Sequence, residues 1–319
     1  HSASDTVTCF ERINKKWGFV GWIANICTWM INMYYVVVGG WVLKYAVQYI
    51  ISGDFGEDKQ AYFNNFTSST VEPIIWALVI LVFVSIMLLF GITNIVEKLT
   101  KFIMPLLFVF LIVCGIWALF VTDNAMEGLK FYLLPDFSKF SFSVFAKAAT
   151  QVLFSVGIGW GIYETLGANI PKENNLKSDA ILVSICDTGA AILAGFVIIP
   201  SAFAGGVDVQ SGPGLVFLVM TDIFGKLPGG RIIGCCFFLA LIFAVISSLF
   251  TFFEISTRTF EDNCKMGRKK ATVVTALIIG IGNIIVSLGF GVLSGVKLPW
   301  IDSTGISHLS LYDWLEIGR

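Results

Sequence analysis

The chain has 319 residues, of which 56% are hydrophobic and 13% charged, and its formal net charge is −1. A soluble domain has about 45–50% apolar and about 25% charged residues. The composition therefore excludes a soluble globular enzyme, a disordered protein and a nucleic-acid-binding protein. It indicates a helical protein that crosses a membrane several times.

Seven segments have the roughly 20 mostly apolar residues that a membrane-spanning helix needs. In chain order they are residues 17–51, 73–92, 102–121, 145–167, 177–204, 231–264 and 272–293. Residues 309–316 are expected to begin an eighth helix. The apolar runs are continuous rather than alternating, which excludes a membrane β-barrel.

The distribution of Lys and Arg predicts the orientation of the chain. The loops on the side of residue 1 carry roughly twice as many basic residues as those on the other side, and such an excess marks the cytoplasm. We therefore expect a multi-pass protein of the plasma membrane whose residue 1 end is cytoplasmic. This orientation argues against a seven-helix receptor, because the chain of such a receptor begins outside the cell. An ion channel is also disfavoured, because it needs polar helix faces along its pore, and residues 73–92 and 272–293 show none.

The reactive side chains do not indicate an enzyme. The two histidines, His1 and His308, lie outside the predicted spans, so a His-dependent intramembrane hydrolase would have no base. The seven cysteines contain no Cys-x-x-Cys pair and lie mostly in apolar stretches. This pattern is typical of buried small side chains rather than of a zinc or disulfide framework.

The predicted span 145–167 contains three alternating glycines, Gly157, Gly159 and Gly161. Each glycine costs about 1 kcal/mol in a helix interior. Gly157 and Gly161 could form a small-residue face for helix packing. We favour the alternative, a broken helix whose free backbone groups line a binding cavity.

Asp187 lies near the middle of the predicted span 177–204. A carboxylate at this depth costs about 2.5–3.5 kcal/mol. It is a protonated structural residue, the partner of a residue outside this chain or, as we favour, the partner of a bound cation.

Two other spans contain candidate ligands. Ser247 and Ser248, in the predicted span 231–264, have the oxygen atoms that hard cations prefer, although hydroxyls in membrane helices usually bond to a carbonyl of their own helix. Tyr35, in the predicted span 17–51, could bind a ligand through its hydroxyl or pack in the core.

Further motifs follow one another along nearly the whole chain. They include Tyr34-Tyr35, Glu97-Lys98, Gln151 to Gly161, Gly212-Pro-Gly, Ser247-Ser248 and Phe260-Glu-Asp262. In order and spacing they resemble the neurotransmitter:sodium symporter family, which has the LeuT fold. The resemblance implies an all-α polytopic membrane protein with an inverted-repeat fold, and a transporter rather than an enzyme.

By this resemblance the seven spans are the family's third to ninth helices, followed by the start of the tenth. The expected fold is therefore an incomplete LeuT-type fold that lacks the first two and the last helices. We expect one transmembrane domain over residues 1–319. The remainder of the first repeat would cover about residues 10–122, and a truncated second repeat about residues 145–319.

The resemblance also implies two sodium sites, a substrate pocket and two gates. The metal ligands would be Ser155 and Asp187 in one site, and the Ala244 carbonyl, Ser247 and Ser248 in the other. The pocket would be lined by Ile31, Tyr35, Phe154, Ser155, Gly157, Trp160, Ser248 and Phe252. The gate acids would be Asp262 on the inner side and Asp313 or Glu316 on the outer side. Phe154 would cover the substrate, and Tyr35 would bond its carboxylate.

Four positions depart from common patterns of the family. Asp187 stands where many members have Asn, and Ala191 where chloride-dependent members have Ser. We therefore expect that chloride is not required, because Asp187 supplies the negative charge. Asn169 replaces an inner-gate Tyr of some members, and Gly157 replaces a hydroxyl and leaves room for a bulky substrate.

The expected function is a sodium-coupled symporter that imports a neutral, hydrophobic or aromatic amino acid by alternating access. The apolar and aromatic character of the predicted pocket favours such a substrate. The expected partners are the small-molecule substrate and the lipid bilayer, with no nucleic acid. Two alternatives are a sodium-coupled transporter of another small solute, such as an amine, and a non-functional partial chain of such a transporter.

Overall fold

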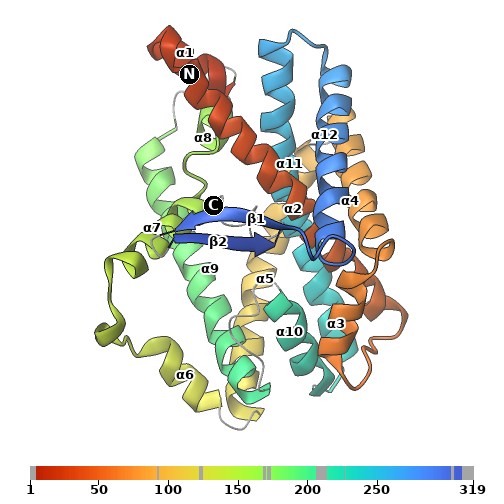
Figure 1. Cartoon of the computed structure of the whole chain (residues 1–319). Coiled ribbons are helices and arrows are strands. Elements are labelled where there is room, and N and C mark those ends of the chain that lie inside the picture. The colour runs from red at the N-terminus through yellow and green to blue at the C-terminus, as the bar shows by residue number, and fades with distance from the viewer. Residues whose placement is uncertain are drawn as a thin grey trace.

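The computed structural model describes residues 5–91, 93–121, 125–167, 170, 174–205, 214–226, 228–302 and 305–310 (Figure 1). The α-helices are α1 Thr6–Ile13, α2 Gly18–Ile51, α3 Lys59–Ser68, α4 Glu72–Leu89, α5 Thr93–Val121, α6 Ala125–Leu133, α7 Phe142–Val156, α8 Ile162–Gly167, α9 Leu176–Gly205, α10 Gly214–Lys226, α11 Gly230–Asn263 and α12 Arg268–Gly289. Two 3₁₀ turns, Lys15–Trp17 and Phe137–Lys139, and two strands, β1 Lys297–Asp302 and β2 Gly305–Ser310, complete the described elements.

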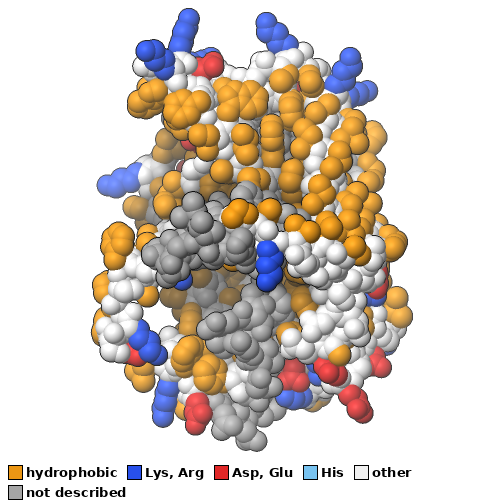
Figure 2. All heavy atoms as spheres, viewed as in Figure 1, with side chains coloured by type: hydrophobic (Ala, Val, Ile, Leu, Met, Phe, Trp, Pro, Cys, Tyr) orange, Lys and Arg blue, Asp and Glu red, His pale blue; other side chains and the backbone are white. Residues whose placement is uncertain are grey.

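Helices cover most of each of the seven expected spans, and the prediction of an all-α polytopic membrane fold is confirmed. Five helices, α2, α4, α9, α11 and α12, are long and apolar enough to cross a membrane by length and composition. Helices α5 and α7 contribute shorter apolar stretches, Lys101–Ile116 and Phe142–Val156. Figure 2 shows hydrophobic side chains covering much of the outer face between two ends that carry charged residues.

Helix ends differ from the expected ones where charged residues flank an apolar run. Helix α5 begins at Thr93 rather than at residue 102, and α12 begins at Arg268 rather than at residue 272. The added turns contain lysines such as Lys98 and Lys269. Lysine has good helix propensity but lowers hydropathy, so the apolar pattern marks the membrane part of a helix and misses its charged end.

The expected eighth helix over residues 309–316 is wrong at its first two positions. Leu309 and Ser310 belong to β2, where they pair with Leu298 and Lys297 of the antiparallel strand β1. Cross-strand pairs stabilise this arrangement through contacts with β1, which lies before the expected helix in the chain. A local pattern over residues 309–316 does not contain that information. Residues 311–316 lie outside the described residues.

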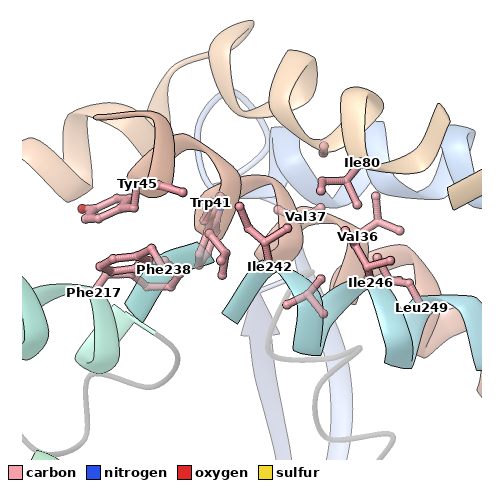
Figure 3. Close-up of a cluster of buried hydrophobic side chains, with 14 of the residues drawn as sticks. Val36, Val37, Trp41, Tyr45, Ile80, Phe217, Phe238, Ile242, Ile246 and Leu249 are labelled. Atoms are coloured by element: carbon pink, nitrogen blue, oxygen red, sulfur yellow. The ribbon is translucent and has the colours of Figure 1, made fainter. Parts of the chain in front are cut away.

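Helix α2 is central and packs against α11, α4 and α12. The contact with α4 is close because Gly40 has no side chain, and a Cβ atom there would lie 2.6 Å from the Ala77 nitrogen. Further along α2, Trp41 and Tyr45 pack with Phe217 of α10 and with residues of α11 (Figure 3). Aromatic pairs of this kind add to the stabilisation from area burial.

Arg231 joins the start of α11 to the end of α2. Its guanidinium donates to the carbonyl oxygens of Tyr49 at 3.1 Å, Ile50 at 2.5 Å and Ile51 at 2.8 Å. These carbonyls have no partner within the helix, and a cation is favoured at this end of the helix dipole. The contact fixes the relative position of the two helices that face the cavity described below.

Candidate functional site

A helix break lies at the glycines singled out in the sequence. Helix α7 ends at Val156 and α8 begins at Ile162. Between them Gly157, Gly159 and Gly161 have φ angles of 84°, 96° and 77°. Only glycine adopts this left-handed region without steric cost. The expected broken helix is therefore present, and the alternative of a continuous helix with a small-residue face is excluded.

Hydroxyl groups bond to three carbonyl oxygens at the break, and two of these hydroxyls come from distant helices. Thr28 of α2 donates to the Trp160 oxygen at 2.7 Å, and Thr6 of α1 donates to the Gly161 oxygen at 3.3 Å. Tyr163 donates to the Val156 oxygen at 2.5 Å. Buried backbone groups need such partners. Sequence reasoning missed Thr6 and Thr28, because both lie far from the glycines along the chain.

A cavity of about 440 Å³ opens beside the break, between α2, α7 and α11. It is lined by Ile31, Tyr35, Gln151, Phe154, Ser155, Val156, Gly157, Trp160, Ile162, Ser248, Thr251 and Phe252. Every residue that we expected in a substrate pocket is among them. The lining is aromatic: the rings of Phe154 and Trp160 meet edge to face at 4.4 Å, and those of Tyr35 and Phe252 at 6.0 Å.

Four lining residues were not predicted as part of the pocket: Gln151, Val156, Ile162 and Thr251. Gln151 precedes Ser155 by four residues in α7, and Thr251 is three residues from Ser248 in α11. Residues with these spacings share a helix face. Helical periodicity applied to the predicted serines could therefore have found both polar side chains.

Ser155 and Asp187 come together although they lie on different helices. The Ser155 hydroxyl of α7 donates to Asp187 Oδ1 of α9 at 2.6 Å. Ser155 also lines the cavity, so the carboxylate lies one hydrogen bond away from the cavity wall. The end of α7 adds a partial negative charge from its last carbonyls. A carboxylate, a hydroxyl and a helix carboxyl end together suit a hard cation.

The other expected sodium ligands lie on α11. The Ser247 hydroxyl donates to the Ala244 oxygen at 2.8 Å, and Thr251 donates to the Ser247 oxygen at 3.1 Å. These are bonds within one helix, as is usual for membrane hydroxyls. Ser248 instead lines the cavity close to Tyr35. The structure thus places the three expected oxygen ligands, the Ala244 carbonyl and the hydroxyls of Ser247 and Ser248, within two turns of α11.

The expected gate acids are only partly within the described residues. Asp262 is exposed in the last turn of α11. Its neighbour Glu261 bonds to Arg268 at 3.1 Å, and Arg268 and Arg258 both pair with Glu254. Asn169, Asp313 and Glu316 lie outside the described residues.

Comparison with known proteins identifies the family of this chain. Residues 61–309 match the model of the sodium:neurotransmitter symporter family. An uncharacterized sodium-dependent transporter of Haemophilus influenzae is 34% identical over 95% of this chain, and one of Methanocaldococcus jannaschii is 32% identical over 88%. The crystal structure of MhsT in complex with L-phenylalanine superposes with a TM-score of 0.91 at 32% identity over 99% of this chain.

The fold and the broken helix define a secondary transporter with the LeuT fold rather than an enzyme. The chain belongs to the sodium:neurotransmitter symporter family. It spans 67% and 61% of the lengths of the two sodium-dependent relatives, and 71% of the MhsT chain.

Proposed function

We propose that the protein is a sodium-coupled symporter that imports a neutral, hydrophobic or aromatic amino acid. The observation that carries this proposal is the position of Ser155, which lines the cavity and bonds to Asp187 at 2.6 Å. A cation bound at this pair would lie beside any molecule in the cavity. Sodium and substrate would then stabilise each other's binding, which is the requirement for coupled transport.

Sodium would act as co-transported substrate at two sites. In the first, Asp187 supplies the neutralising charge and Ser155 a hydroxyl oxygen. In the second, the Ala244 carbonyl, Ser247 and Ser248 supply oxygen atoms from one face of α11. Because Asp187 already carries a negative charge in the first site, we propose that chloride is not required.

The lining of the cavity supports an apolar substrate. None of the described lining residues is charged, and aromatic rings come from α2, α11 and the helix break. The volume of about 440 Å³ falls in the range of small-molecule pockets. The Tyr35 hydroxyl would bond to the substrate carboxylate, and Phe154 would cover the side chain. The phenylalanine bound in MhsT supports the same class of substrate.

Transport would proceed by alternating access between the two membrane faces. The cavity would lie between the repeats at about residues 10–122 and 145–319, and the broken helix of α7 and α8 would change its position against the packed pair of α2 and α11. Asp262 would close the inner side, and Asp313 or Glu316 the outer side. We place the protein in the plasma membrane with the residue 1 end in the cytoplasm, because basic residues are more frequent in the loops on that side.

The experiment is radiolabelled uptake by the full-length protein in vesicles, with sodium or potassium outside. The panel contains phenylalanine, leucine, alanine and an aromatic amine, and empty vesicles are the control. Sodium-dependent uptake of a hydrophobic amino acid that persists when gluconate replaces chloride would support the proposal. Uptake of the amine alone would overturn the substrate class, and uptake that is equal in potassium would overturn sodium coupling.

A further inference from the structure

A second hollow lies outside the transport cavity, at the connection between α11 and α12. Its volume is about 630 Å³. It is lined by Lys265, Met266, Gly267, Lys269, Lys270, Val273 and Val274. The lining therefore combines three cationic side chains with apolar ones, and neither sodium coupling nor the substrate pocket uses any of these residues.

The three lysines are exposed and surround this hollow, and none of its described lining residues is acidic; the exposed Asp262 in the last turn of α11 is not part of the lining. Within the part of the chain that the structure describes, the nearby carboxylates Glu254 and Glu261 form their ion pairs with Arg258 and Arg268. No ion pair in that part involves the three lysines. Like charges held close together repel each other, and a bound anion would remove this repulsion.

The backbone holds Lys265 in a conformation that glycine usually adopts. Its φ angle is 52°, and it is the one non-glycine residue with a positive φ in the described chain. The Met266 nitrogen donates to the Phe260 oxygen at 3.3 Å, which closes the end of α11. Helices commonly end in this way with glycine at the left-handed position. A lysine there is less stable than glycine, and it directs a charge to the hollow.

An apolar stripe leads from the hollow along α12. Val273, Leu277, Ile281 and Ile285 follow at intervals of four residues and are 49%, 61%, 62% and 44% exposed. The stripe is about 18 Å long at 1.5 Å per residue, and half of the hydrocarbon core is about 15 Å thick. Figure 2 shows Lys and Arg at the end where α12 begins and hydrophobic side chains beside it.

We propose that this hollow binds the phosphate headgroup of an anionic phospholipid whose acyl chain lies along the stripe. The positive charge is complementary to the phosphate, and the length of the stripe matches one leaflet. A soluble anion would use the lysines but not the stripe. A nucleic acid or an acidic peptide could not follow an apolar helix face into the membrane, so the lipid accounts for both features.

Native mass spectrometry of the full-length protein in detergent tests the proposal. The probes are dioleoyl phosphatidylglycerol, dioleoyl phosphatidylcholine with the same acyl chains, and glycerol 3-phosphate without acyl chains. We expect retention of phosphatidylglycerol over phosphatidylcholine. The variant K265Q/K269Q/K270Q should weaken phosphatidylglycerol binding roughly tenfold or more, because basic residues near the surface dominate the attraction to anionic lipid.

The matched control is R12Q/K15Q/K16Q, which removes three exposed basic residues from the same end of the molecule (Figure 1). It should leave phosphatidylglycerol binding within about twofold of the unchanged protein. An equal loss in both triple variants would show general charge attraction and overturn the site. Full displacement of the lipid by glycerol 3-phosphate would overturn the role of the stripe.

Lys265→Gly distinguishes loss of the site from loss of the fold. Glycine relieves the left-handed backbone strain, so this variant should melt no lower than the unchanged protein while its phosphatidylglycerol binding falls severalfold. Unchanged lipid binding in both Lys265→Gly and the lysine triple variant would refute the proposal.

Discussion

Asp187 shows that a single charged residue within an apolar helix can indicate a functional site. A carboxylate inside an apolar helix is costly unless it has a partner, so its position alone indicated a function. The structure places it at 2.6 Å from the Ser155 hydroxyl. We predict that Asp187→Ala abolishes sodium-dependent substrate binding, because it removes the charge that would neutralise the cation. Sodium titration of phenylalanine binding to the purified full-length protein measures this effect.

Asp179→Ala is the control for this variant. Asp179 is an exposed aspartate in the first turn of the same helix, α9. The Asp179→Ala variant should bind sodium and phenylalanine with the same affinities as the unchanged protein. Unchanged sodium affinity in a folded Asp187→Ala protein would contradict the assigned site, and equal loss in both variants would indicate a general effect of charge on α9.

Gly157 supports a prediction about backbone conformation. Its φ is 84°, and an added Cβ would lie 3.0 Å from Ile162 Cδ1. Gly157→Ala should destabilise the protein by about 1–2 kcal/mol, because alanine is strained in the left-handed region. It should also weaken phenylalanine binding, since Gly157 lines the cavity. Thermal unfolding and equilibrium binding measure the two effects separately.

Gly56 provides the matched control for backbone strain. Its φ is 72°, nothing lies within 4 Å of an added Cβ, and it is outside the cavity lining. Gly56→Ala should show a similar loss of stability with unchanged phenylalanine affinity. If it weakened phenylalanine binding as much as Gly157→Ala does, the effect at Gly157 could not be assigned to the cavity.

Some individual residues of the site could be predicted from the sequence, and others could not. Asp187 and the glycines were predictable because each departs from what an apolar helix tolerates, whereas Ser155 was predicted only through the family resemblance. Thr28 bonds to the Trp160 oxygen across 132 residues of chain. A threonine in a helix normally bonds to its own helix, so nothing local distinguishes Thr28. Only the packing of α2 against the break assigns its role.

At the scale of elements, the sequence predicted helices by apolar length and missed what depends on contact between segments. The break between α7 and α8 was predictable from alternating glycines. The hairpin of β1 and β2 was not, because strand pairing depends on partners rather than on local propensity. Helices α3 and α10, which are short, were also missed, since a length criterion for membrane spans passes over them.

Helices α3 and α10 are joined by an ion pair that makes stability depend on pH. Asp222 of α10 bonds to Lys59 of α3 at 3.2 Å and to Lys226 at 2.6 Å. Burial alone would raise the pKa of Asp222, but hydrogen bonds from Lys226 and Lys59 outweigh it and lower the pKa below 3.8. A lowered pKa stabilises the folded state above the unfolded value of about 3.8. This stabilisation is lost as the pH falls through the lower folded pKa.

Asp222→Asn should therefore cost up to about 1 kcal/mol at pH 6, as is usual for a partly exposed pair, and progressively less below pH 4. Chemical unfolding of both proteins at several pH values measures the difference. Glu57→Gln, which removes an exposed carboxylate just before α3, is the control and should not reproduce this pH profile. A difference that grows on acidification would contradict the sign argued here.

For the whole molecule, the site exists only because segments far apart in the chain meet. Tyr35, Ser155 and Ser248 come from three helices, α2, α7 and α11, and line one cavity. Through a resemblance the sequence could predict the members and the pairing of Ser155 with Asp187 in one site, but not the volume of the cavity or the 2.6 Å hydrogen bond between these two side chains. These depend on the packing of α2 and α11, which the Arg231 contact holds in position.

The last prediction concerns coupling between the two ligands. If sodium at Asp187 and Ser155 lies beside the substrate, each ligand must raise the affinity of the other by the same factor, because binding free energies are linked reciprocally. We expect a factor of about 5–150, the usual range of such coupling. Phenylalanine affinity measured across sodium concentrations gives one factor, and sodium affinity with and without phenylalanine gives the other. Potassium should give no enhancement, and Asp187→Ala should reduce both factors to one. A coupling factor that changes with chloride concentration or with pH would show that chloride or a proton binds with the substrate, and would contradict a chloride-independent site neutralised by Asp187 alone.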